Sequence, residues 1–326
     1  MSKIRKFFFG LLLSLLLVLF LTNSFFTGAF ALANPLLYLF LSFIVIFLFV
    51  LYGAGSAVPV FLAALLSVYV SHYDNGAVYP VSFIQLIIFV LIPWLFSYLM
   101  SRGISIQRSL FYPPVLIFIF LSAGIFLYLF SSRADIVPQI NSYASALAAQ
   151  TQALYGKIGL KSLASPGMNV EIKSLFADML LLLPGIALSL SWIGLWVGFL
   201  MVKAVFKNIE TAPSYIKNYI SGALFRVSDY FIVLLLAGII TVLLSPEVYK
   251  FIGYNIIFAV SSVYMVQGLS IISYFFIKNN LNFFLRVLIY ILIFLFSNPL
   301  LVIVIIAGIF DTWFNFRERA SKIKKE

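Results

Sequence analysis

The chain has 326 residues, of which 63% are hydrophobic and only 10% are charged, and its mean hydropathy is +1.13. Soluble domains carry roughly 25% charged residues, so this composition excludes an ordinary soluble protein and predicts one that lies in a bilayer. The absence of cysteine excludes disulfides, thiolate metal sites and cysteine nucleophiles.

The net charge of +11 does not indicate nucleic-acid binding, because most of the basic residues flank apolar runs. In such positions Lys and Arg set the orientation of spans and contact lipid headgroups. We therefore expect the lipid bilayer as the main partner, with anionic lipids at the basic loops, and no nucleic acid.

Nine apolar segments are candidate spans, since a spanning helix needs about 20 mainly apolar residues. They cover residues 7–31, 35–52, 56–71, 81–100, 112–131, 177–202, 228–245, 254–277 and 284–310. Turn residues separate several of them, at Asn34-Pro35, Gly53-Ala54-Gly55, Asp74-Asn75-Gly76, Tyr112-Pro113-Pro114, Ser245-Pro246 and Lys278-Asn279-Asn280. The predicted fold is all-α, a polytopic transmembrane helical bundle of eight full spans plus a ninth, interrupted segment.

We expect one integral membrane domain over residues 1–326. It comprises five spans in 1–131, an external excursion over 132–176, the remaining spans with a cytoplasmic loop over 177–312, and a basic tail over 313–326. The first segment also resembles a secretory signal that ends at Ala29-Phe30-Ala31. A retained first helix is the preferred interpretation, because the next segments need a start that is already inserted.

The orientation follows from the basic loops. A cytoplasmic N-terminus leaves most of the loop Lys and Arg on the cytoplasmic side through the eighth segment, as the positive-inside rule requires. A ninth segment that crossed fully would carry the basic tail outside, but Asn298-Pro299 interrupts it. We expect two half-helices that form a re-entrant hairpin and return the C-terminus to the cytoplasm, with a kinked full span as the alternative.

The external excursion contains a predicted amphipathic helix over residues 138–156, which ends before Ser165-Pro166-Gly167. Its apolar face comprises Ile140, Tyr143, Ala144, Leu147, Leu154 and Ile158. It is either a connector on the membrane surface or a lid over the bundle. A second amphipathic stretch, over 207–224, is either a lipid anchor or a docking helix for a cytoplasmic partner.

Two segments carry polar and small residues on one helical face. In the eighth, Ser261, Tyr264, Gln267 and Gly268 form a stripe that serves either helix packing or a ligand cavity. In the sixth, Pro184 predicts a kink, and small residues predict close packing with a helix of this chain, a second copy or another membrane protein. The small residues are Gly185, Ser189, Gly194 and Gly198.

The few charged residues near the spans suggest structural roles. Asp178 is expected at the positive end of the sixth helix, and Arg226 and Asp229 on one helical face where the seventh begins. His72 beside Asp74 has no further metal ligand nearby. We expect no cofactor, no metal and no enzymatic activity, because no catalytic motif is present.

The C-terminal quarter carries a distinctive set of residues. It contains Tyr264-Met265-Val266-Gln267-Gly268-Leu269-Ser270, Tyr274-Phe275-Phe276, Asn298-Pro299, and Gly308, Asp311, Phe314, Asn315 and Arg317. This set resembles the YybS-like family of predicted bacterial multi-pass membrane proteins, whose function is unknown, and implies the bacterial inner membrane. The signature residues are Gln267, Gly268, Asn298, Pro299, Gly308, Asp311, Asn315 and Arg317. Arg226-Val227-Ser228-Asp229 departs from the tryptophan or proline expected of the family there.

The family is distantly similar to substrate-binding S-components of energy-coupling-factor transporters and to the rod-shape protein MreD. The first similarity implies a small-molecule binding or transport subunit with a pocket between segments six and eight, covered by the 138–156 helix and lined by Gln267, Tyr264 and Asp229. Gly10 with Ser14, or Ala29 with Ala33, are partial matches to the small-residue faces of such subunits. The second similarity implies a scaffold that organises a membrane complex through the tail and the 207–224 helix.

Overall fold

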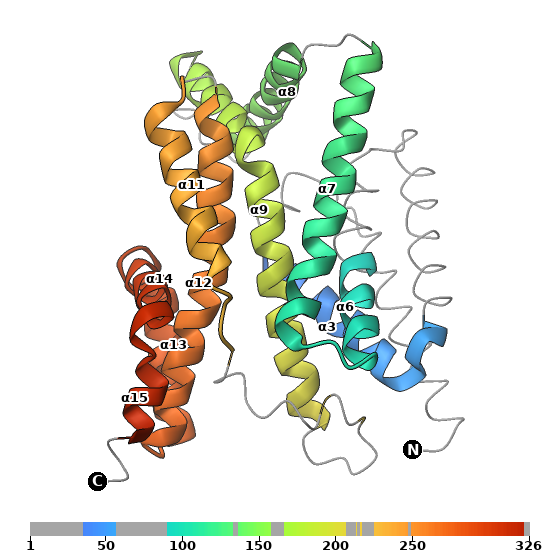
Figure 1. Cartoon of the computed structure of the whole chain (residues 1–326). Coiled ribbons are helices and arrows are strands. Elements are labelled where there is room, and N and C mark those ends of the chain that lie inside the picture. The colour runs from blue at the N-terminus through green and yellow to red at the C-terminus, as the bar shows by residue number, and fades with distance from the viewer. Residues whose placement is uncertain are drawn as a thin grey trace.

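A computed structural model of the chain describes residues 35–56, 90–132, 136–157, 166–206, 213, 216, 225–246 and 249–322 (Figure 1). Every regular element in these ranges is helical, so the all-α class is confirmed for them. The elements are α3 (Pro35–Tyr52), η1 (Gly53–Ser56), α6 (Ile92–Ser101), α7 (Ile106–Ser132), α8 (Ile136–Lys157), α9 (Pro166–Phe206), α11 (Tyr230–Leu244), α12 (Lys250–Lys278), α13 (Phe283–Leu295), α14 (Ser297–Phe314) and α15 (Phe316–Lys322).

Several sequence predictions fall outside these ranges. They concern the first and third apolar segments, the signal-like site at Ala29-Phe30-Ala31, the small-residue pairs Gly10 with Ser14 and Ala29 with Ala33, His72 with Asp74, and nearly all of the 207–224 helix.

Two of the described helical stretches are long and apolar enough to cross a membrane, by length and composition: Ile172–Phe206 and Lys250–Lys278. Shorter apolar stretches are Ser42–Gly55, Ile106–Phe120, Tyr230–Leu244, Phe283–Ile293 and Pro299–Phe314. The bundle of eight full spans therefore stays a prediction.

Helices α9 and α12 form the centre of the described structure. Helix α9 packs against α3, α7, α8 and α12, while α12 packs against α11 and α14. Figure 1 shows α8 at one end of this arrangement, and the α6–α7 turn, the end of α9, the α12–α13 turn and α15 at the other. We call the latter the lower end; Arg102, Arg108 and Lys278 belong to it.

Helix α7 runs without interruption through Pro113 and Pro114, so the predicted break at Tyr112-Pro113-Pro114 is wrong. Both prolines are buried, and α7 packs against α6 and α9. Packing of this kind makes proline tolerable inside helices of membrane proteins, because neighbouring groups satisfy the freed backbone.

Helix α9 begins at Pro166, so the end of the predicted excursion over 132–176 is already helical. Proline suits the first turn of a helix, where its missing N–H would have no helical partner anyway. Asp178 consequently lies inside α9 and is exposed, and the prediction that it marks the positive end of the helix is wrong.

Helix α8 matches the predicted amphipathic helix closely, but its buried face differs. Ala144 and Ala148 are buried where α8 packs against α9, whereas Tyr143 is 61% exposed. The small alanines allow α8 to approach α9 closely, and this contact turns Tyr143 away from the helix interface.

Asn255 of α12 binds the backbone of α9 beside Pro184. In a regular helix the Gly185 N–H would donate to the Leu181 carbonyl. Here Asn255 Oδ1 accepts from Gly185 N at 2.6 Å, and Asn255 Nδ2 donates to Leu181 O at 2.8 Å. Ser189 extends the contact, since its hydroxyl lies 3.4 Å from the Phe258 carbonyl.

Another small residue of α9, Gly198, faces α3. Gly194 and Gly198 are both buried, and a Cβ on Gly198 would lie 2.9 Å from Phe43 N. Helix α9 thus uses small residues against two partners, with Gly185 against α12 and Gly198 against α3, and both partners belong to this chain.

The ninth apolar segment is split into α13 and α14, which meet at Phe296, two residues before the predicted Asn298-Pro299. Helix α13 has 13 residues, about 20 Å, and is short of the roughly 30 Å hydrocarbon core. After α14, the chain returns to the lower end, where Lys278 Nζ donates to the Ala320 carbonyl of α15 (Figure 1). The segment therefore leaves and rejoins the same end of α12.

Candidate functional site

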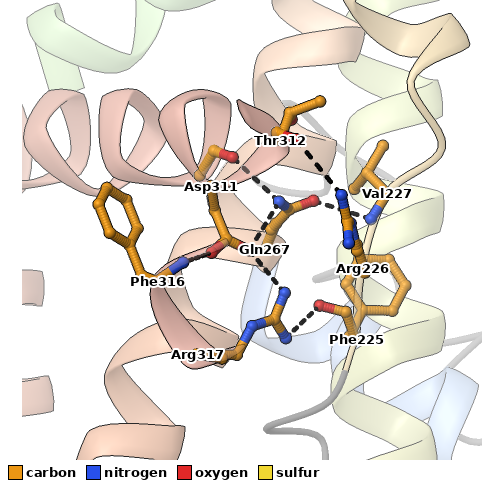
Figure 2. Close-up of polar contacts among 9 residues, drawn as sticks. Phe225, Arg226, Val227, Gln267, Asp311, Thr312, Phe316 and Arg317 are labelled. Carbon is orange, nitrogen blue, oxygen red and sulfur yellow. Dashed lines mark hydrogen bonds and ion pairs between the residues drawn. The ribbon is translucent and has the colours of Figure 1, made fainter. Parts of the chain in front are cut away.

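Most of the signature residues meet where α14 and α15 cross α12 (Figure 2). Gln267 and Gly268 come from α12, Gly308 and Asp311 from α14, and Arg317 from α15. Asn298 and Pro299 lie apart from them in sequence, in the first turn of α14, and Pro299 is exposed. We call Gln267, Asp311 and Arg317, with the backbone that they bind, the C-terminal hub.

Two glycines allow the crossing. A Cβ on Gly308 would overlap the Tyr264 carbonyl, and one on Gly268 would overlap the Val304 carbonyl. The two glycines face each other, because the Gly308 Cβ position is 3.1 Å from Gly268 N. Backbone contact of this closeness between membrane helices requires small residues at the interface.

Gln267 is fully buried, and its carboxamide is bound by protein on all sides. Its Oε1 accepts a hydrogen bond from Val227 N at 2.8 Å. Its Nε2 donates to the Gly308 carbonyl at 3.0 Å and to Asp311 Oδ2 at 3.2 Å. Gln267 therefore joins three segments of the chain that lie far apart in sequence.

Asp311 is also fully buried and is neutralised by Arg317, whose NH2 lies 2.6 Å from Asp311 Oδ2. Asp311 Oδ1 accepts from Phe316 N at 2.9 Å. The intervening residue Asn315 has a φ of +47°, a left-handed conformation that asparagine tolerates better than most residues. These contacts define the turn from α14 into α15.

The hub holds a non-helical segment, residues 225–228, that enters α11 from below beside α12 (Figure 1). Gln267 Oε1 accepts a hydrogen bond from Val227 N, and Arg317 NH1 donates one to the Phe225 carbonyl at 2.9 Å. Phe225 also joins an aromatic cluster with Phe111 of α7, which in turn contacts Trp192 of α9. The segment is thus fixed between α7 and α9 on one side and α12 and α14 on the other.

The depth of this break explains the need for the hub. Helix α11 has 15 residues, about 22 Å, so it falls roughly 8 Å short of the hydrocarbon thickness. Val227 lies beside Gln267, 11 residues before the end of α12 at Lys278, about 16 Å along the helix. Non-helical backbone at such a depth is tolerated only where protein or water satisfies it.

Arg226 and Asp229 do not share a helical face, so that prediction is wrong. Arg226 belongs to the non-helical segment and donates from NH2 to the Thr312 carbonyl at 3.3 Å. Asp229 is the N-cap of α11, and its side chain makes no capping hydrogen bond. Both residues are exposed. Arg226 is instead bound to the end of α14.

Two buried hydroxyls lie beside these charges. The Tyr264 hydroxyl is next to that of Thr312 and within electrostatic range of Asp229. The two hydroxyls partner each other, and neither meets the geometry of a hydrogen bond with any further protein group. We call Arg226, Asp229, Tyr264 and Thr312 the break cluster.

The structure thus brings two of the three predicted ligand-binding residues, Tyr264 and Asp229, together at the start of α11. Gln267 lies one helical turn from Tyr264 and is occupied by the hub. Sequence reasoning missed Thr312 and Asn255; Asn255 carries the same signal as Gln267, a carboxamide within an apolar run. The described residues contain no group of three or more His, Cys, Asp or Glu side chains that could hold a metal ion.

Long apolar helices, small-residue crossings and polar groups satisfied inside the bundle are the features of a polytopic α-helical membrane protein. The chain belongs to a family described as predicted membrane protein (DUF2232), whose model matches residues 12–312. No curated protein and no solved structure matches the chain.

Proposed function

We propose that this protein is a small-molecule binding or transport subunit of the bacterial inner membrane, similar in plan to an S-component. The observation that carries the proposal is the break before α11, where a short helix begins from non-helical backbone beside the buried Gln267 of α12. Interrupted helices of this kind form the substrate sites of many transporters, because their free helix ends can bind polar ligands.

The proposed site is the break cluster at the lower end of α11. Helix α8 lies at the opposite end (Figure 1). A pocket covered by the 138–156 helix therefore does not fit a site built on Tyr264 and Asp229. In this proposal Gln267 positions the backbone of the site and does not contact the ligand, because its carboxamide is already bound.

The remaining parts of the proposal follow from the sequence. The protein crosses the membrane several times with both termini in the cytoplasm, uses no cofactor and catalyses no reaction. Energy for transport would come from an ion gradient or from separate subunits.

Ligand binding tests this proposal directly. The purified protein is examined by mass spectrometry for co-purified small molecules, and its thermal unfolding is followed with a broad vitamin and metabolite panel. We expect one class of compound to co-purify or to raise the unfolding temperature. If no compound does either, the binding function is wrong.

A membrane scaffold similar to MreD is the second candidate, and the exposed apolar faces of α13 and α14 favour it. Phe283, Phe284, Trp313 and Phe314 are all more than 40% exposed. Such aromatic surface suits contact with other membrane proteins as well as with lipid. Crosslinking followed by pull-down separates the two functions: stoichiometric recovery of an ATPase supports transport, and recovery of envelope-synthesis proteins supports the scaffold.

A further inference from the structure

The last described helix, α15, depends on its docking against α12 and α14. It has only seven residues, and isolated helices of this length are at best marginal in water. Arg317 anchors its start by binding Asp311 of α14, and Ala320 anchors its end by accepting a hydrogen bond from Lys278 of α12. Arg319, between these anchors, is exposed. Helix α15 is therefore ordered by docking and not by its own helical propensity.

The same docking fixes the chain that precedes α11. Arg317 bridges two segments, because its NH2 binds Asp311 Oδ2 at 2.6 Å and its NH1 donates to the Phe225 carbonyl at 2.9 Å (Figure 2). Arg226 reaches the other way, from the non-helical segment to the Thr312 carbonyl of α14. Residues 225–228 are thus held by the end of α14 and by docked α15, and undocking of α15 would remove the Phe225 bond.

The buried charge of Asp311 makes undocking cooperative. Asp311 is fully buried, and its carboxylate loses both Arg317 and the Phe316 N–H when α15 leaves. A buried carboxylate without its ion partner is strongly destabilising, so Asp311 would move when α15 undocks. Asp311 is also bonded to Gln267, which holds the Val227 N–H. The loss of α15 is thereby transmitted to both of these bonds of the 225–228 segment.

We propose that α15 is a latch on the start of α11, so that its undocking from α12 and the release of residues 225–228 are one coupled transition. The latch connects the basic tail at the lower end with the non-helical backbone beside Gln267. Because coupling between two sites is reciprocal, the start of α11 acts on α15 as strongly as α15 acts on it. This inference goes beyond the proposed function and does not depend on it.

Hydrogen–deuterium exchange of the full-length protein in lipid nanodiscs, without ligand, measures both ends of the latch. The amides followed are Val227, which donates to Gln267, and Arg319, which donates to the Asn315 carbonyl. Each is protected only while its segment is in place, so its exchange rate reports the local opening of that segment.

Arg317→Gln removes the ion pair with Asp311 and the bond to Phe225 together. We expect exchange to become about tenfold faster at Val227 as well as at Arg319. Lys278→Met, which removes only the far anchor, should accelerate both amides too, and it serves in place of Arg317→Gln if that variant does not fold.

The matched control for these variants is Arg102→Gln. Arg102 is an exposed arginine of the lower end that contacts Tyr98 of its own helix, and its replacement should change neither amide.

Phe225→Ala tests the coupling from the opposite side. It removes the ring that packs against Phe111, and it loosens residues 225–228 without altering any residue of α15. A latch predicts faster exchange at Arg319 in this variant. A helix that is merely anchored by Arg317 would show no change there.

Three outcomes overturn the latch. The first is faster exchange of Arg319 in Arg317→Gln with Val227 unchanged, and the second is unchanged exchange of Arg319 in Phe225→Ala. The third is an equal rise throughout α8, because the opening would then be global. All of these measurements are made without ligand. Their failure therefore leaves the proposed binding function standing, and a metabolite panel that finds no ligand leaves the latch standing.

Discussion

At the scale of single residues, Gln267 shows how one polar side chain can hold non-helical backbone inside a membrane protein. It is fully buried and bonds Val227 of the non-helical segment and Gly308 and Asp311 of α14, so it joins both segments to α12. Such bonds between segments are a common use of polar residues in membrane bundles. The same contacts explain why a glutamine is present in an otherwise apolar span.

Replacement of Gln267 by leucine should destabilise the protein by at least about 2 kcal/mol, because buried groups left without a partner each cost about 1–3 kcal/mol. The Val227 N–H would be one such group. Unfolding in mixed micelles measures the change. Asn141→Leu, at an exposed amide on α8, is the control and should change stability little. Equal stability of both variants would contradict the role of the hub.

Asn315 should be replaceable by glycine but not by alanine. Its φ of +47° is left-handed, and that conformation costs most L-residues about 1–2 kcal/mol. Asn315→Ala should therefore lose about 1 kcal/mol relative to Asn315→Gly, measured in the same unfolding assay. A more stable alanine variant would show that the turn between α14 and α15 is not left-handed.

At the scale of elements, close crossings between helices position the site. The crossing of α12 by α14 depends on Gly268 and Gly308, and the contact of α12 with α9 beside Pro184 depends on Asn255. Both bring polar groups of one helix against the backbone of another. The start of α11 is then held between these packed helices.

Gly308→Ala should separate α12 from α14, because the added methyl would overlap the Tyr264 carbonyl. Overpacking in a core costs about 1–3 kcal/mol, and a clash with rigid backbone should be at the upper end of this range or beyond it. Unfolding temperature and protease sensitivity of the tail measure the effect. The control is Gly55→Ala, where nothing lies within 4 Å of the added methyl. Similar loss in both variants would refute the crossing.

At the scale of the whole molecule, the path of the last third of the chain is the main architectural result. Helices α13, α14 and α15 leave the lower end of α12 and return to it, through the split at Phe296 and the contact of Lys278 with Ala320. This path keeps the basic tail beside the basic end of α12. It agrees with a re-entrant hairpin, which the positive-inside rule favours.

Lys322→Cys should be inaccessible to a membrane-impermeant thiol reagent added outside intact cells. The chain has no native cysteine, so labelling reports only the introduced one. Asn279→Cys, in the α12–α13 turn, should be protected in the same way, whereas Tyr249→Cys, between α11 and α12 at the other end, should be labelled. Labelling of position 322 together with 249 would contradict the hairpin.

The membrane character and the ends of most helices were predictable from the sequence because they depend on local properties. Apolar runs of membrane length define α12 and α9, and Pro35 and Asn279-Asn280 stand where helices begin or end. The signature residues Gln267, Gly308, Asp311 and Arg317 were also recognisable, since polar and small residues are rare in such runs.

What only the tertiary structure decided is how these residues meet. The bond from Arg317 to Phe225 joins residues 92 positions apart, and that from Gln267 to Asp311 joins residues 44 apart. No local pattern encodes such pairings. The continuity of α7 through Pro113 and the non-helical backbone at Arg226 also depend on tertiary contacts, so neither could be inferred from the sequence.

The sequence by itself determined that the chain enters the membrane and which residues are unusual there, because burial in lipid acts on each segment separately. The packing of α14 and α15 against α12 determined where those residues act, because a buried polar group is stable only beside the partners that the fold brings to it.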